Sequence, residues 1–151
     1  MSGIDVFLDS SALFAGVASS TGAARALLLL AEADQITITV SEQVVTETER
    51  ALARRLPQAL PYYRQALRST GLRIVHNPSL EENRAHQDII SHPPDVSIVL
   101  AAMKANAGFL ATFNRRHFID DAEVTVRAGT PIGTTGDALA WVRQQLTHAA
   151  T

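Results

Sequence analysis

Acidic and amide side chains stand where several of them could share a metal ion. Asp9 ends an apolar segment, Asp95 precedes the most apolar stretch of the chain, and Asn114 follows another apolar segment. Converging carboxylates repel one another and usually imply a bound cation. Oxygen ligands without cysteine suit Mg²⁺ or Mn²⁺. Such an ion can activate water and stabilise an in-line phosphoryl displacement, which is the chemistry of nucleases and phosphatases.

Two glutamates compete for a place in this set. Both belong to a helical stretch whose inner stripe is formed by Val44, Thr48, Ala51 and Leu52. At about 100° per residue, Glu47 falls on one border of the stripe and Glu49 on the other. Periodicity alone does not choose between them.

The acids also have structural interpretations. Asp9 and Asp95 could each cap a helix N-terminus, and capping uses only part of a carboxylate, so it is compatible with metal binding. Asp5 lies about 13 Å of strand away from Asp9, at the wrong end for a shared site.

Several other classes of site are excluded or disfavoured. The chain has no cysteine, so thiolate zinc sites, thiol nucleophiles and disulfides are excluded. Its five histidines show no zinc-type spacing, and we expect no histidine ligand set. The net charge of −2 provides no basic field for nucleic acid. Any such contact must therefore use a local cluster, of which Arg115, Arg116 and His117 are the candidate.

The elements that must position these residues alternate between strands and helices. Strands are predicted at residues 4–9, 36–40, 72–75 and 109–112, with 124–126 as a candidate fifth and 129–136 as a loop. Helices are predicted at residues 12–17, 23–33, 42–56, 60–70, 80–90, 95–107 and 137–146. This alternation favours an α/β fold with a mostly parallel central sheet of four or five strands, flanked by helices on both faces. In such sheets ligands bind beyond the carboxyl ends of the strands, where Asp9 and Asn114 stand.

Size and composition fit one domain spanning residues 1–151. Hydrophobic residues make up 46% of the chain, which is enough for a core. The first residues lack the basic region of a signal peptide, and the most apolar run, 26–31, is far short of the ~20 residues of a membrane span. We therefore expect a soluble, cytoplasmic protein without a membrane association.

Four segments, in order, resemble motifs of the PIN domain, with VapC-type toxin ribonucleases as the nearest relatives. Residues 6–13 place apolar residues before Asp and Ser, and residues 40–47 place a serine cap six residues before a glutamate. Residues 94–102 place Asp before an apolar, alanine-rich helix, and residues 110–118 contain the T-x-D/N element that ends the fourth strand. The resemblance covers about residues 4–126.

The resemblance implies a PIN-like fold and a Mg²⁺- or Mn²⁺-dependent endoribonuclease. It implies Asp9, Glu47 and Asp95 as metal-binding acids, and so favours Glu47 over Glu49. Asn114 takes a fourth catalytic position where many relatives have Asp; some relatives with Asn there carry an acid three residues later, where this chain has His117. The resemblance also implies a cognate antitoxin protein as partner, and a homodimer.

Two other functions compete with this one. Asn114 favours a catalytically degenerate PIN module that binds RNA or a protein partner without cleavage. An aspartate-phosphorylated protein with Asp9 as nucleophile ranks last, because such enzymes want a second Asp two residues on and Ser11 is there instead.

Overall fold

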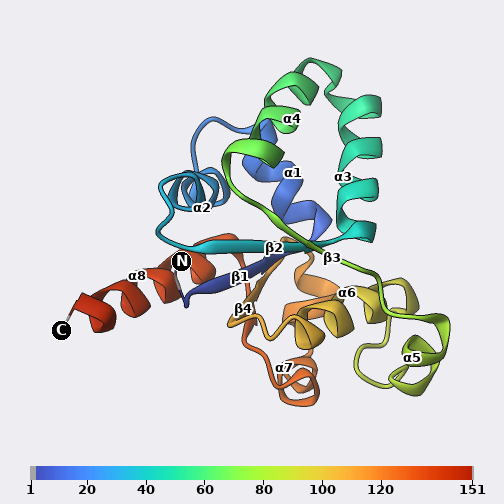
Figure 1. The fold of residues 1–151 in the computed structure, drawn as a ribbon. Helices are drawn as coiled ribbons and strands as arrows, with labels where there is room; N and C mark the ends of the chain where they lie inside the picture. The colour runs from blue at the N-terminus through green and yellow to red at the C-terminus, as the bar shows by residue number, and fades with distance from the viewer. Residues whose placement is uncertain (1–2, 151) are drawn as a thin grey trace.

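A parallel five-stranded sheet runs through the middle of the computed structural model, which describes residues 3–150 (Figure 1). The strands are β1 Asp5–Leu8, β2 Thr37–Ser41, β3 Arg73–Val75, β4 Phe109–Ala111 and β5 Ile132–Gly133. Their order is β3-β2-β1-β4-β5, and every pairing is parallel. The α/β class and the parallel sheet predicted from the sequence are confirmed.

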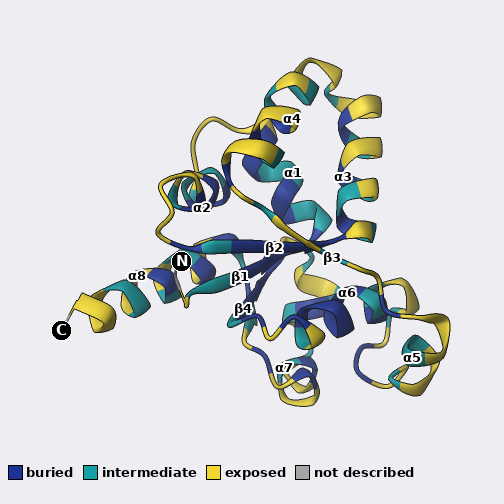
Figure 2. Cartoon of the chain, in the orientation of Figure 1, coloured by how far each residue is buried: buried dark blue, intermediate teal, exposed yellow. Residues whose placement is uncertain are grey.

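The two central strands are apolar because both of their faces are covered. Val6, Phe7 and Leu8 of β1 are fully buried, as is Leu110 of β4 (Figure 2). A strand buried on both faces shows a continuous apolar run rather than alternation. The register pairs Leu8 with Ala111, so β1 and β4 end side by side.

Helices cover both faces of this sheet. On one face lie α1 Ser10–Ala18, α2 Ala23–Glu32, α3 Glu42–Arg55, the short η1 Pro57–Ala59 and α4 Leu60–Ser69 (Figure 1). On the other lie α5 Leu80–Ala85, α6 Pro93–Lys104 and α7 Ala122–Ala128, with a π-helical turn, η2 Arg115–Ile119, between β4 and α7. The closing helix α8, Thr135–Ala150, packs against α2 and β4.

The fifth strand was predicted in the wrong place. Residues 124–126 belong to α7, although Val-Thr-Val favours a strand. Asp121 caps this helix by accepting the backbone N–H of Glu123, and Gly129, at φ 65°, ends it in the left-handed region. These helix boundaries outweigh the local preference, and β5 forms instead at 132–133, inside the predicted loop.

A second difference concerns the helix predicted over residues 80–90. The capping box of Ser79 and Glu82 forms as predicted, but α5 ends at Ala85. The following segment is held by a tertiary contact, in which Arg127 Nε donates to the Ile89 carbonyl at 2.9 Å.

No single helix within residues 3–150 is long and apolar enough to cross a membrane. Helices α1 and α2 are long and apolar enough for a span only when they are taken together, and an 85° bend separates them. Each of them buries an apolar face in the core.

Candidate metal centre

Asp9 sits at the carboxyl end of β1 and is almost completely buried. It is the N-cap of α1: its Oδ1 accepts from the backbone N–H of Ala12 at 2.9 Å and from Ser11 Oγ at 2.7 Å. Thr112, which follows β4, donates its hydroxyl to Asp9 Oδ2. The capping role considered for Asp9 is confirmed, and the aspartate is held rigidly beside the end of the neighbouring strand.

The electrostatics of Asp9 combine burial, hydrogen bonds and a neighbouring carboxylate. Burial raises the pKa of Asp9, while hydrogen bonds from Thr112, Ala12 and Ser11 lower it. The nearby charge of Asp95 raises this pKa further, so the two carboxylates are electrostatic neighbours. A cation between them would offset both the desolvation and the repulsion.

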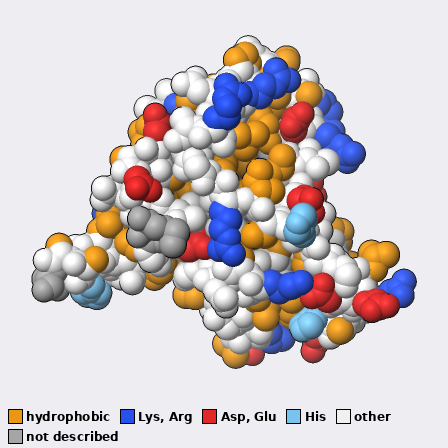
Figure 3. Space-filling view, in the orientation of Figure 1, with side chains coloured by type: hydrophobic (Ala, Val, Ile, Leu, Met, Phe, Trp, Pro, Cys, Tyr) orange, Lys and Arg blue, Asp and Glu red, His pale blue; other side chains and the backbone are white. Residues whose placement is uncertain are grey.

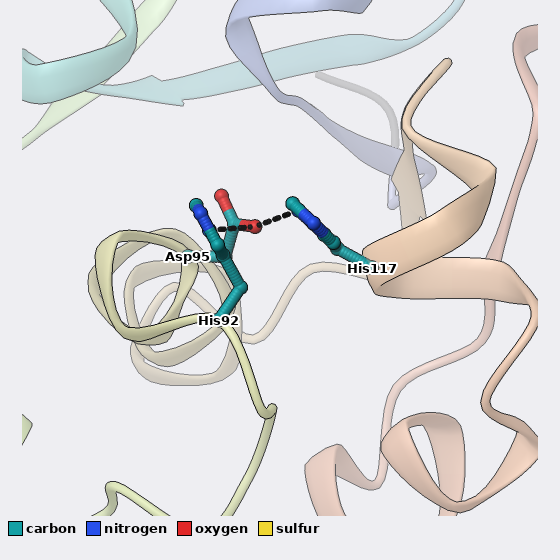
Figure 4. Close-up of side chains that lie close together, drawn as sticks. All are labelled: His92, Asp95 and His117. Carbon is teal, nitrogen blue, oxygen red and sulfur yellow. Dashed lines mark hydrogen bonds and ion pairs between the residues drawn. The ribbon is translucent and has the colours of Figure 1, made fainter.

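Asp95 stands in the first turn of α6 rather than at its cap. The N-cap is His92, and Pro93 and Pro94 fill the first two helical positions, which suit proline because their N–H groups need no partner. The capping role considered for Asp95 is therefore wrong. Its carboxylate is instead available, with Oδ2 2.8 Å from His92 Nδ1 and 3.1 Å from His117 Nδ1 (Figure 4).

The structure separates the two competing glutamates. Glu47 is half-buried and accepts from Gln43 Nε2 at 3.2 Å, and the same nitrogen lies 3.4 Å from the Pro94 carbonyl beside Asp95. Gln43 therefore ties Glu47 to the start of α6. Glu49 is exposed, and its charge acts on Tyr63 in α4 instead.

Glu47 also lines a surface cavity next to Asp9. The residues around this cavity are Ser10, Ser11, Phe14, Glu47, Ala51 and Arg55. Glu47, Ala51 and Arg55 share one face of α3 at a spacing of four residues. Arg55 stacks over Phe14 at 4.7 Å and brings a positive charge to the cavity.

The segment after β4 holds the remaining candidates. Asn114 caps η2, with its Oδ1 accepting the backbone N–H of His117 at 3.2 Å and its Nδ2 2.9 Å from His117 Nδ1. Its own backbone N–H donates to Thr112 Oγ1, the hydroxyl that also serves Asp9. Asn114 thus contacts the groups around the acids rather than the acids themselves. Arg115 and Arg116 are exposed beside it.

Sequence reasoning missed His92 and Arg55. We expected no histidine ligand set, because that expectation rested on spacing along the chain; the fold instead brings His92 and His117 to the same carboxylate. The signal for His92 was its place three residues before Asp95, ahead of two prolines. The signal for Arg55 was its place eight residues after Glu47 on the same helix face.

The donor chemistry of the site fits a divalent metal ion. Within residues 3–150, no hydrogen bond reaches Oδ1 of Asp95, and the side chain of Asp95 remains 15% exposed. Asp9 and Asp95 offer hard carboxylate oxygens near one another, and Glu47 lines the cavity with Ser10 and Ser11. Among the described residues, the ligand atoms that lie within 4.8 Å of one another belong to His92, Asp95 and His117, so Asp9 and Glu47 stand outside that group. Lys and Arg side chains gather at the top of the view, where α3 ends and α4 begins (Figure 3).

Comparisons with known proteins agree with this fold. A family model described as the PIN domain matches residues 5–116. The crystal structure of PAE2754 from Pyrobaculum aerophilum superposes with a TM-score of 0.63 at 17% sequence identity, covering 93% of this chain and 90% of that one. At this identity the likeness shows the fold alone. No curated protein matches the chain by sequence.

Proposed function

The chain belongs to the PIN-domain family, whose members are generally nucleases, and on this premise we propose that it is a metal-dependent endoribonuclease. The observation that carries the proposal is the pairing of Asp9 and Asp95. One is buried at the end of a central strand, the other stands in the first turn of α6, and each lies within the electrostatic reach of the other. A divalent cation suits such a pair of carboxylates, and the same cation would stabilise the charge on the RNA phosphate during cleavage.

Each residue has a proposed role. Asp9, Glu47 and Asp95 would hold Mg²⁺ or Mn²⁺, and the ion would supply Lewis-acid activation of water and of the phosphodiester. The backbone N–H of Asn114 donates to the Thr112 hydroxyl, which in turn donates to Asp9. The hydroxyls of Ser11 and Thr112 and the Ala12 N–H hold Asp9 in a single orientation, so the geometry of this ligand is set before any metal binds.

The proposed RNA contacts lie at two places beside the acids. Arg115, Arg116 and His117 follow β4, and Arg55 stands in the cavity with Glu47. Arginine pairs with phosphate in a bidentate manner, so these side chains would hold the backbone of a single strand. The half-buried His117 is the least exposed of the three residues after β4.

The experiment is cleavage of a labelled RNA with Mg²⁺ or Mn²⁺ and after chelation. We expect Glu47→Gln to abolish cleavage and Glu49→Gln to leave it near wild type, because only Glu47 lines the cavity beside Asp9. The two variants remove the same charge from neighbouring positions of one helix, so each controls for the other. Equal losses, or a greater loss from Glu49→Gln, would contradict the assignment.

A degenerate module that binds RNA or a partner without cleavage is the second candidate. The observation that favours it is Asn114, which brings an uncharged amide where an acid would add a ligand charge. Metal titration of cleavage separates the two: retention of RNA without cleavage at any concentration of Mg²⁺ or Mn²⁺ would support the module and refute the nuclease.

We also propose that the protein is the toxin of a type II toxin–antitoxin pair, cytoplasmic and homodimeric. The resemblance of residues 6–13, 40–47, 94–102 and 110–118 to VapC-type toxins supports this role. Expression of the chain in bacteria should arrest growth, and Asp9→Asn should relieve the arrest. A short partner encoded beside it should also relieve the arrest, and light scattering should give the mass of a dimer. Growth unaffected by wild-type expression would contradict the toxin role.

A further inference from the structure

Two histidine rings meet at the carboxylate of Asp95. His92 caps α6 and His117 lies in η2, and their rings stack with centroids 4.0 Å apart at 18° (Figure 4). One ligand atom from each ring and one from Asp95 lie within 4.8 Å of one another. Nothing in the acid set of Asp9, Glu47 and Asp95 explains why two imidazoles should converge here.

The contacts of His117 show that this cluster is not satisfied by its own hydrogen bonds. Nδ1 of His117 lies 2.9 Å from Asn114 Nδ2, which can only donate, and 3.1 Å from Asp95 Oδ2, which accepts when ionised. One ring nitrogen can serve only one of these demands. Rotating the amide gives no relief, because Asn114 Oδ1 already accepts the backbone N–H of His117.

A cation between the two groups removes this conflict. The cation would be coordinated by Nδ1 of His117 and by an oxygen of the Asp95 carboxylate, and no proton is then needed between these two atoms. Asn114 is only half-buried, so solvent can accept from its amide N–H while its Oδ1 keeps the backbone N–H of His117. His92 Nδ1, which touches only Asp95 Oδ2 among the described contacts, supplies the third ligand.

We infer that His92, Asp95 and His117 form a mixed imidazole–carboxylate site for a divalent transition-metal ion of the Zn²⁺ and Co²⁺ class. Imidazole nitrogen favours these ions, whereas Mg²⁺ prefers an all-oxygen set. Three protein ligands leave a further position open, as in catalytic rather than structural zinc sites. The side chains of His92 and His117 are 41% and 28% exposed, so an ion can reach them from solvent.

This inference rests on the proposed function only through Asp95, which both ligand sets share. The two histidines change the expected metal specificity. The protein should bind Zn²⁺ and Co²⁺ more tightly than Mg²⁺, because two of the three ligands are imidazoles. The site is thus a property of this chain's own histidines rather than of the acids.

The test is metal binding without RNA, with Co²⁺ followed by its visible absorption and Zn²⁺ by calorimetry and competition. His92→Phe and His117→Phe keep the stacked rings and remove the ring nitrogens. Each should weaken Zn²⁺ and Co²⁺ binding by at least about tenfold, because even outer-shell partners of a metal contribute about 10–100-fold. Mg²⁺ binding should fall less than Zn²⁺ and Co²⁺ binding, because Mg²⁺ prefers oxygen ligands and neither variant removes one.

The matched control is His76→Phe, since His76 is exposed and contacts only Glu42 among the described side chains. Melting without metal checks that each variant folds. Zn²⁺ affinity that is unchanged in the double variant, or that falls equally in His76→Phe, would overturn the inference. RNA cleavage is scored separately: histidine-dependent Zn²⁺ binding without cleavage refutes the nuclease alone, and Mg²⁺-supported cleavage with unchanged Zn²⁺ affinity in the variants refutes this inference alone.

Discussion

Replacing Thr112 by valine isolates the hydroxyl that joins Asp9 to the end of β4. Thr112 is fully buried, and valine keeps its shape. The hydroxyl donates to Asp9 Oδ2 and accepts the backbone N–H of Asn114 at 2.9 Å. The substitution therefore leaves a buried carboxylate oxygen short of a donor and a backbone N–H short of an acceptor.

The cost follows from these two contacts. A hydrogen bond to a charged group is worth about 1.5–3 kcal/mol, and an unpaired polar group costs about 1–3 kcal/mol. The added methyl group of valine recovers about 0.8 kcal/mol by burial. We expect a net loss of about 2–5 kcal/mol in the free energy of unfolding, or roughly 4–20 °C in Tm for a chain of this size.

Thr48 provides the matched control. It is also fully buried, but its Oγ1 has no hydrogen-bond partner among the described residues. Thr48→Val removes an unpaired polar atom, so it should be neutral or stabilising by about 1 kcal/mol. Chemical denaturation of both variants, without metal, gives the comparison. Changes of the same sign and size would refute the assignment of a hydrogen-bonding role to Thr112.

Three further predictions concern titration and metal affinity. The hydrogen bond from Lys104 Nζ lowers the pKa of Glu82 from 4.5 to about 2. Ionised Glu82 therefore stabilises the fold above pH 4.5, and this contribution is lost as the pH falls toward 2. In a series of melting temperatures measured against pH, Glu82→Gln should reduce the fall in Tm at acid pH. Burial, and to a smaller extent the charge of Glu49, raises the pKa of Tyr63 from 10.0 to about 12. The neutral phenol therefore contributes stability below pH 10, and this contribution is lost as the pH rises through 12. In an ultraviolet titration Tyr63 should be the last tyrosine to ionise, and Tyr63→Phe should abolish the later transition. Asn114→Asp should tighten Mn²⁺ binding measured by calorimetry, because it adds a charge beside the acids; an unchanged affinity would place Asn114 outside the site.

The sequence by itself determined strands β1 to β4 and two chemical groups of the site. Apolar runs such as residues 6–8 and β-branched runs such as 37–40 are local patterns that only buried strands satisfy. Asp9 follows such a run directly, so its place at a carboxyl end of the sheet needed no tertiary information. Asp95 is a second example, because the apolar residues that follow it predict a helix and so place Asp95 near the start of α6.

Boundaries and competing local preferences required the fold. Residues 124–126 favour a strand by composition, yet Asp121 and Gly129 close a helix around them. Asp95 could serve as a cap by type, yet Pro93 and Pro94 move the helix start upstream to His92. In both cases neighbouring residues with stronger conformational constraints decided the outcome.

Only the tertiary structure decided which side chains meet. Glu47 and Glu49 lie on opposite borders of one helical stripe, and periodicity treats them alike; the packing of α3 places Glu47 beside the cavity near Asp9, while the charge of Glu49 acts on Tyr63. His92 and His117 come from separate elements, and no spacing along the chain pairs them. A ligand set depends on distances through space, here between η2 and the start of α6, which local sequence does not encode.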